Sequence, residues 1–211
     1  METLIRQFHS AGTYVIGEMN AFEDSLVSNV YRPLSVATAG KVRWLDWQYH
    51  GWLDPYSEEA KDYLTALAKE IAALGADEIL LDKCAFPTRG RPGLLYFPQE
   101  QQVSRVDILT AFAADLQASL ADVGAELSFR FDLAWKDLVA SGSGVDTARL
   151  GSFGEVFFNA QTPDGTDTAF SCAFTVQYSD AGAGNTARQY ADAAGGGLIL
   201  VSADGRYPAE W

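Results

Sequence analysis

The sequence is poor in cysteine and histidine, and it lacks the common cofactor motifs. Its two cysteines, Cys84 and Cys172, have no spacing typical of a metal site or a disulfide framework, so we expect reduced thiols. Its two histidines, His9 and His50, form neither His-x-His nor His-Glu-x-x-His, which argues against a catalytic zinc. There is no phosphate loop, dinucleotide fingerprint or Gly-x-Ser-x-Gly elbow. We therefore expect neither a metal nor a cofactor.

Positive charge and long apolar runs are also scarce. The chain has 15 Lys and Arg residues and 28 Asp and Glu residues, which gives a net charge of −13. Nucleic acids and anionic membranes repel such a chain, so neither is an expected partner. No apolar run approaches the ~20 residues of a membrane span. The N-terminus lacks a signal-peptide core, so the chain as written is expected in the cytoplasm, or outside the cell if its true start lies upstream.

The composition is otherwise that of a folded protein. Apolar residues make up 48% and aromatic residues 12% of the chain. The 211 residues suit one domain covering residues 1–211. They are few for a complete (β/α)₈ barrel, which typically needs about 250.

The clearest structural signal lies in residues 52–87, WLDPYSEEAKDYLTALAKEIAALGADEILLDKCAFP. Asp54 or Ser57 can cap a helix that ends at Gly75. The segment EILLD at residues 78–82 then reads as a strand covered on both faces, with Asp82 at its carboxyl end. The apolar stripe predicted for the helix recurs at steps of three and four residues: Ala60, Tyr63, Leu64, Leu67, Ala68 and Ile71.

Other strands and helices are predicted around this unit. A helix begins near Ser104, with Asp107 as its capping partner, and ends at Gly124; Phe112, Leu116, Leu120 and Val123 share one stripe. Strict alternation predicts a strand at 126–133, with Leu127, Phe129, Phe131 and Leu133 toward the helices. Ser128, Arg130 and Asp132 then point inward. Further strands are expected at residues 13–22, 155–159, 172–179 and 197–204, and a helix at 185–194.

Residues 52–87 resemble the signature block of a bacterial family of putative glycosyl hydrolase domains. The family pattern has Trp-Leu-x-Pro-Tyr, a helix, and then Gly-Phe-Asp-Glu-Ile-Gln-Phe-Asp-Tyr-x-Arg-Phe-Pro. The upstream segment HSAGTYVIGEMNAFED is similar to the family's His-x-x-Gly-x-Tyr-Val-Ile-Ala-Arg strand and the following Phe-Lys-Asp. The resemblance implies an α/β fold of the (β/α)₈ TIM-barrel type that acts on carbohydrate. Residues 13–22 correspond to about the third strand of that barrel, so six strands are recognisable and the first two are missing.

Glycoside hydrolysis uses two carboxyl groups flanking the scissile bond. Four acidic residues are expected at the carboxyl ends of strands: Glu18, Asp82, Asp132 and Asp204. Only Asp82 matches the family motif, and Asp132 is the favoured partner. Asp82 could instead cap a turn or pair with Lys83.

Glu18 and Lys83 depart from the family pattern. Glu18 stands where the family usually has Arg, and Lys83 stands where it has Tyr. Ala85 replaces the Arg of Arg-Phe-Pro, which removes a group able to hold a sugar hydroxyl or orient Asp82. A hypothetical ion pair between Glu18 and Lys83 on adjacent strands would compensate for these changes. Lys83 also remains a candidate substrate-binding residue.

A cluster of aromatic residues precedes the helix of residues 58–74. Trp44, Trp47 and Trp52 lie in the segment RWLDWQYHGW, and Tyr56 follows in the family motif. Aromatic faces can stack on sugar rings, which makes these four candidate substrate-binding residues. The alternative, slightly favoured, is that they pack a long loop onto the barrel rim.

Two functional interpretations remain open. The first is a glycoside hydrolase acting on an oligo- or polysaccharide through a carboxylate pair at the carboxyl rim of the barrel. The second is a barrel that has lost turnover and serves as a carbohydrate-binding or structural domain. In either case the expected ligand is a carbohydrate, and a second copy of the chain or a missing segment would cover the open sheet edge.

Overall fold

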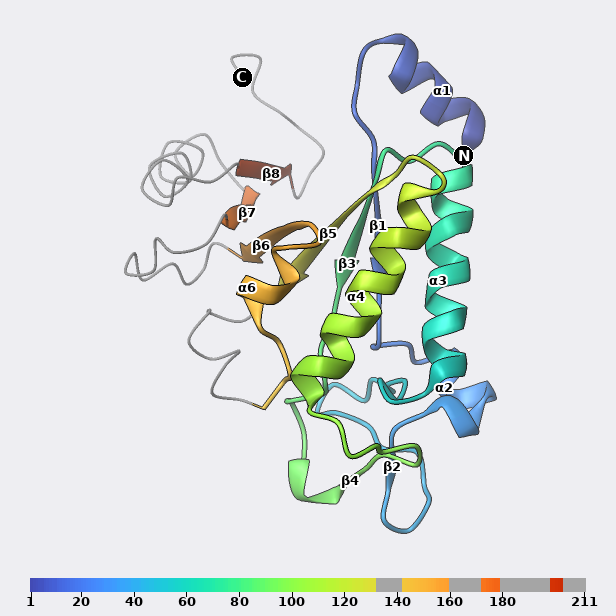
Figure 1. Cartoon of the computed structure of the whole chain (residues 1–211), viewed down its shortest axis with the longest axis vertical. Coiled ribbons are helices and arrows are strands. Elements are labelled where there is room, and N and C mark those ends of the chain that lie inside the picture. Colours follow the sequence, from blue (N-terminus) through green and yellow to red (C-terminus); the bar gives the residue numbers. More distant parts are fainter. Residues whose placement is uncertain (132–141, 160–171, 179–197, 203–211) are drawn as a thin grey trace.

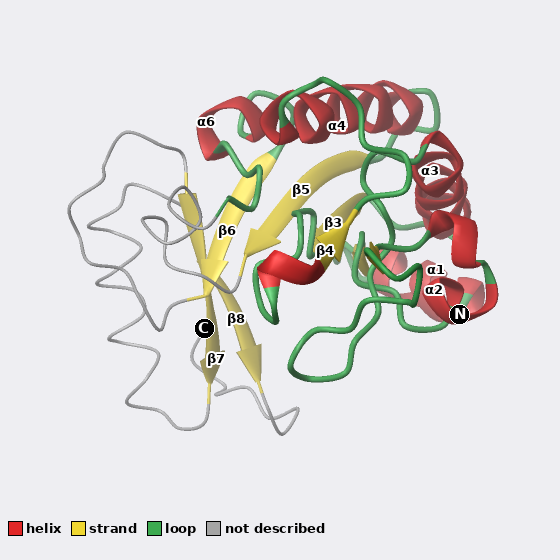
Figure 2. Ribbon diagram, turned by 90° about the horizontal axis from the view of Figure 1, so that it is seen from below, coloured by secondary structure: helices red, strands yellow, loops and turns green. Residues whose placement is uncertain are grey.

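The core of the fold is one parallel sheet. The computed structural model describes residues 1–131, 142–159, 172–178 and 198–202. The strands follow the order β1-β3-β5-β6-β7-β8, and every neighbouring pair is parallel. Figure 2 shows that the sheet is curved, which agrees with the partial (β/α)₈ barrel that the family resemblance implied. The strands are β1 (Ile16–Asn20), β3 (Glu78–Asp82), β5 (Glu126–Phe131), β6 (Glu155–Asn159), β7 (Cys172–Tyr178) and β8 (Leu198–Ser202).

Helices cover the outer face of this sheet (Figures 1 and 2). Helix α3 (Glu58–Ala73) contacts β1 and β3, α4 (Arg105–Ala121) contacts β5, and α6 (Thr147–Leu150) contacts β6. Helix α1 (Glu2–Ser10) precedes β1. None of the helices in the described ranges is long and apolar enough to cross a membrane.

Helix α3 forms as the sequence predicted. The Ser57 hydroxyl accepts a hydrogen bond from the Ala60 amide at 3.2 Å, which satisfies one of the free donors of the first turn. At the other end Gly75 has a φ of +109°, a left-handed conformation that glycine adopts without a steric cost. The predicted stripe packs into the core, with Ala60, Leu64 and Ala68 fully buried.

The alternation in β5 sorts its side chains as expected. Leu127, Phe129 and Phe131 are buried in the core, and Arg130 lies among charged groups on the inner face. The predicted stripe of α4 is confirmed for Phe112, Leu116 and Leu120. It is wrong for Val123, which lies beyond the end of the helix at Ala121 and is 46% exposed.

Two long segments form the carboxyl rim of the sheet. Residues 21–57 follow β1 and include α2 (Val27–Val30), the 3₁₀ helix η1 (Arg32–Leu34) and β2 (Ala37–Thr38). Residues 83–104 follow β3 and include η2 (Pro92–Leu94) and β4 (Leu95–Tyr96). Because β2 pairs antiparallel with β4, the two rim segments are hydrogen-bonded to one another.

Candidate functional site

The carboxyl ends of β1 and β3 lie side by side. Asn20 is the register partner of Asp82, and the pairing continues past both strands. The Ala21 amide donates to the Asp82 carbonyl at 2.7 Å, and the Phe22 amide donates to the Lys83 carbonyl at 3.3 Å. This edge brings residues from three strands and both rim segments together.

Asp82 is buried and engaged by cations. Only 5% of the surface of Asp82 is exposed to solvent. Oδ1 accepts from the Lys83 amide at 2.8 Å, while Oδ2 accepts from Arg130 Nη2 at 2.9 Å and lies 3.6 Å from Lys83 Nζ. The turn-capping and Lys83-pairing roles considered from the sequence are therefore both present. Arg130 on the neighbouring strand is an additional partner that sequence analysis did not assign.

Arg130 bridges two carboxylates. Its Nη1 donates to Glu18 Oε2 at 2.9 Å, and its Nη2 donates both to Glu18 Oε1 and to Asp82 Oδ2. Burial alone would lower the pKa of Arg130, but its hydrogen bonds to Asp82 and Glu18 raise the pKa. The described ion pairs thus place Glu18 on Arg130 and Lys83 on Asp82, so the expected Glu18–Lys83 pair was wrong. Asp132 and Asp204, the other candidate carboxylates, lie outside the described residues.

A pocket opens beside these groups, with an empty volume of about 470 Å³ that includes space open to solvent. Asp82 is not part of its wall, whereas its partners Lys83 and Arg130 are. The remaining lining residues are Glu23, Trp52, Ala85, Phe86, Thr88, Arg89, Phe131 and Ser143.

Among the described residues that line the pocket, Glu23 is the acidic one, and sequence analysis missed it. It lies three residues after β1, and its side chain is only 14% exposed. Burial raises the pKa of Glu23; His50 and Lys83 lower it, and Asp46 and Asp82 raise it further, with a net upward shift. Its place just beyond a strand end was the available signal. The residue was overlooked because the strand was expected to run to residue 22, which assigned Glu23 to an irregular loop.

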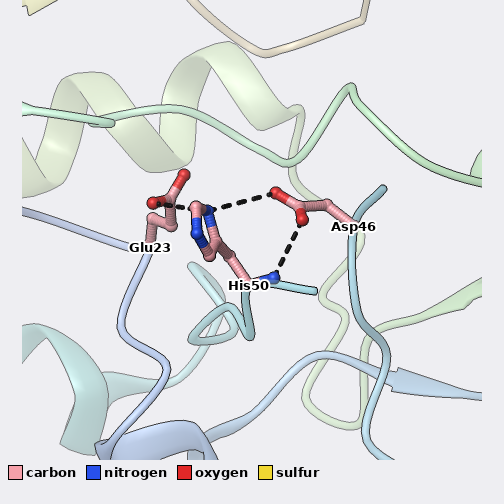
Figure 3. A group of neighbouring side chains, drawn as sticks. All are labelled: Glu23, Asp46 and His50. Atoms are coloured by element: carbon pink, nitrogen blue, oxygen red, sulfur yellow. Dashed lines mark hydrogen bonds and ion pairs between the residues drawn. The ribbon is translucent and has the colours of Figure 1, made fainter. Parts of the chain in front are cut away.

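Asp46 and His50 approach Glu23 from the loop before Trp52 (Figure 3). The Asp46 side chain is 2% exposed, and its Oδ1 accepts from the amides of Gln48 at 2.8 Å and His50 at 2.9 Å. Trp52 Nε1 donates to Asp46 Oδ2 at 3.3 Å. These bonds fix a tight turn that places His50 Nδ1 3.1 Å from Glu23 Oε1.

The four candidate aromatic residues have different environments. Trp52 lines the pocket, whereas Trp47 is 74% exposed. Trp44 is buried, and its Nε1 donates to the Arg91 carbonyl at 3.4 Å. Tyr56 is buried and packs edge-on against two other rings, those of Phe86 and Phe97. Of these four residues, only Trp52 contributes to the described pocket.

Comparisons with known proteins show the family and the fold of the chain. The family described as "Putative glycosyl hydrolase domain" matches residues 1–133. A hypothetical protein from Ruminiclostridium thermocellum ATCC 27405 is similar in structure, with 29% identity over 61% of this chain and 64% of that one and a TM-score of 0.53. No curated protein matches the chain.

More distant solved structures share the fold. The glycoside hydrolase domain of PelA from Pseudomonas aeruginosa has a TM-score of 0.58 at 12% identity, over 95% of this chain and 82% of that one. TtGalA, an alpha-galactosidase from Thermus thermophilus in complex with p-nitrophenyl alpha-D-galactopyranoside, has a TM-score of 0.52 at 15% identity, over 93% of this chain. The chain spans under two thirds of the Ruminiclostridium protein and 34% of TtGalA.

Proposed function

Since the chain belongs to the family described as "Putative glycosyl hydrolase domain", we propose that it hydrolyses a glycosidic bond with Glu23 as general acid and Asp82 as the second carboxyl group. Glu23 here takes the place that sequence analysis gave to Asp132. Glu18 is less suited, because it is half exposed and does not line the described pocket. The substrate class we propose is an oligo- or polysaccharide.

The observation that carries this proposal is the contrast between the two carboxyl environments. Glu23 is desolvated in the pocket wall, and burial raises its pKa, which favours the protonated form that a general acid needs. Asp82 lies against Arg130 and Lys83, whose positive charges stabilise a carboxylate. Glycoside hydrolysis requires a proton donor and a second carboxyl group, and this pair supplies both.

The two carboxyl groups, which follow β1 and end β3, would have different roles in the reaction. Glu23 would protonate the departing glycosidic oxygen, and Trp52, in the same wall, would offer an apolar surface to a sugar ring. The negative charge of Asp82 would stabilise the positive charge that develops on the sugar. Direct attack by Asp82 would require the substrate to displace Lys83 or Arg130, because these side chains separate it from the pocket.

The position of Asp82 behind Lys83 and Arg130 also supports the carbohydrate-binding interpretation. Asp82 is neutralised by two cations and is absent from the described pocket wall. A barrel with this arrangement could hold a sugar through Trp52, Arg89 and Lys83 without cleaving it. This is the second candidate function.

Hydrolysis of aryl glycosides tests the proposal. Because similar structures are named for complexes with p-nitrophenyl alpha-D-galactopyranoside and with galactosamine, a panel should include galacto- and galactosamine-configured substrates. Glu23→Gln should lower kcat by roughly 10²–10⁴-fold for substrates with poor leaving groups, and much less for nitrophenolate, which needs no protonation. Glu18→Gln is the matched control, because it makes the same chemical change at a carboxylate that contacts Arg130 but does not line the described pocket.

The outcomes separate the two candidates. Loss of activity in Glu23→Gln that depends on the leaving group supports the hydrolase. Saturable sugar binding by calorimetry without turnover of any substrate supports the binding domain. Equal losses in Glu18→Gln and Glu23→Gln would contradict the role of Glu23 as the acid.

A further inference from the structure

We propose that Glu23, Asp46 and His50 form a binding site for a divalent cation of the zinc or manganese class (Figure 3). One ligand atom from each residue lies within 4.8 Å of the other two. The set combines two carboxylates with one imidazole, drawn from the rim segment that follows β1. The cation site does not depend on the proposed hydrolase activity.

The distances between the donors suit a single ion. Ligands about 2.1 Å from one metal in tetrahedral geometry lie roughly 3.4 Å apart. His50 Nδ1 is 3.1 Å from Glu23 Oε1 and 3.9 Å from Asp46 Oδ2, so the two separations bracket that value. These separations, together with the 4.8 Å limit on the third, are compatible with coordination of one ion by all three residues.

His50 supplies a second observation. Its Nδ1 is shielded from solvent and has no hydrogen-bond partner among the described residues. The nearby Glu23 oxygen is close enough for a hydrogen bond, but its direction from the ring does not satisfy one. The His50 side chain as a whole is 43% exposed, but its Nδ1 faces the oxygens of Glu23 and Asp46 without a well-aligned hydrogen bond, which is a position that suits a cation. A metal ion accepts the lone pair that no described donor uses.

Hydrogen bonds from neighbouring groups hold the Asp46 carboxylate in place. Asp46 accepts hydrogen bonds from the backbone amides of Gln48 and His50 and from Trp52 Nε1. Tyr49 has a φ of +63°, a costly conformation for a residue with a side chain, and the turn that it permits aims His50 at Glu23. Outer-shell hydrogen bonds to ligating carboxylates are typical of metal sites, because they fix the orientation of the ligand.

The donor set and its surroundings define the class of cation. Imidazole favours transition metals over Ca²⁺ and Mg²⁺, whereas carboxylates also suit Mn²⁺. Three protein ligands leave at least one coordination position open, and Glu23 borders the pocket. A bound cation would occupy the carboxylate that serves as the proposed acid. We therefore expect the cation to inhibit hydrolysis reversibly.

Calorimetric titration of the full chain with ZnCl₂ and separately with MnCl₂, after removal of metal with EDTA, tests the site. We expect one saturable site for each ion, Zn²⁺ binding more tightly than Mn²⁺, and much weaker binding of Mg²⁺. The Mn²⁺ titration discriminates against Cys84 and Cys172, since thiolates are poor ligands for that ion. Saturation should raise the melting temperature by roughly 5–10 °C at a hundredfold excess over Kd.

Variants identify the ligands. Glu23→Gln and His50→Ala should each weaken binding roughly tenfold or more. His9→Ala is the matched control, since His9 also pairs with a carboxylate, Asp77 at 2.9 Å, but precedes β1. His50→Gln, which keeps a polar side chain, serves if the alanine variant is unstable.

Three results would overturn the site: no saturable binding of either ion, unchanged affinity in the two ligand variants, or an equal loss in His9→Ala. Hydrolysis is measured separately in EDTA, so absence of activity there counts against the proposed function and leaves the metal titration unaffected. Inhibition by Zn²⁺ that EDTA reverses, and that His50→Ala weakens, would support both proposals.

Discussion

Replacing Arg130 with methionine should destabilise the fold more than any other single charge removal at the sheet edge. The guanidinium lies between Asp82 and Glu18, and methionine keeps much of the aliphatic length while deleting every hydrogen-bond donor. Asp82 would then be left buried, with Lys83 Nζ 3.6 Å away as its nearest described cation. An uncompensated carboxylate in such surroundings costs free energy, because it has lost water as well as its partner.

The magnitude follows from the exposure of the three side chains. Removing one partner of a buried ion pair costs about 3–5 kcal/mol. The side chain of Arg130 is 20% exposed and that of Asp82 is 8% exposed, so solvent screens the pair little. The Glu18 side chain is 48% exposed, and its share should be at most about 1 kcal/mol. We therefore expect Arg130→Met to cost about 3 kcal/mol, and Glu18→Gln to cost about 1 kcal/mol or less.

Urea denaturation followed by tryptophan fluorescence measures these differences. The double variant Asp82→Asn with Arg130→Met should recover part of the loss, because the orphaned charge is then absent. Arg149→Met is the control: Arg149 contacts Asp107 at 2.6 Å, but both side chains are about half exposed, and no measurable change is expected. Equal effects of Arg130→Met and Arg149→Met, or strictly additive effects in the double variant, would refute the reasoning.

Two further predictions concern packing and pH. Gly17→Ala should cost about 1–3 kcal/mol in unfolding free energy, because the new Cβ would clash with Ile71 Cγ2 between β1 and α3. Gly93→Ala, with open space around it, should be nearly neutral, and similar urea midpoints for both variants would contradict tight packing at Gly17. Because burial raises the folded-state pKa of Glu23, its contribution to stability is present at low pH and is lost as pH rises from 4.5 through the folded-state value. Glu23→Gln should therefore gain stability relative to the parent as pH increases through that window, in urea titrations with EDTA; a difference that is independent of pH would argue against a desolvated carboxyl group.

Local sequence patterns predicted most individual elements of the described part of the fold. Ser57 and Gly75 bound α3 because capping and left-handed glycine act within a few residues. The alternation in β5 separated Phe129 from Arg130 because successive side chains in a strand point to opposite faces. Val123 was misassigned because a helical stripe does not reveal the residue at which the helix stops. The predicted helix at residues 185–194 lies outside the described residues.

The site depended on contacts between segments far apart in the chain. The sequence predicted Asp82 as a candidate from its position at the end of a buried strand and from its motif. Its partner Arg130 is 48 residues away and became adjacent only through the register of β3 with β5. The expected Glu18–Lys83 pair failed for the same reason, since Arg130 satisfies Glu18 from a strand that sequence spacing could not place.

The amino-acid sequence by itself determined where the main helices and strands of the sheet form, because capping, periodicity and alternation act over a few neighbouring residues. The (β/α)₈ barrel was implied by the resemblance of residues 52–87 to a known family. Only the tertiary structure decided which charges meet, since that depends on strand register and on the path of the rim segments. It placed Glu23 beside Asp46 and His50, 23 and 27 positions further along the chain, and it left Asp82 behind two cations. Burial and electrostatic pairing arise from those long-range contacts, and they set the chemistry available to each carboxyl group.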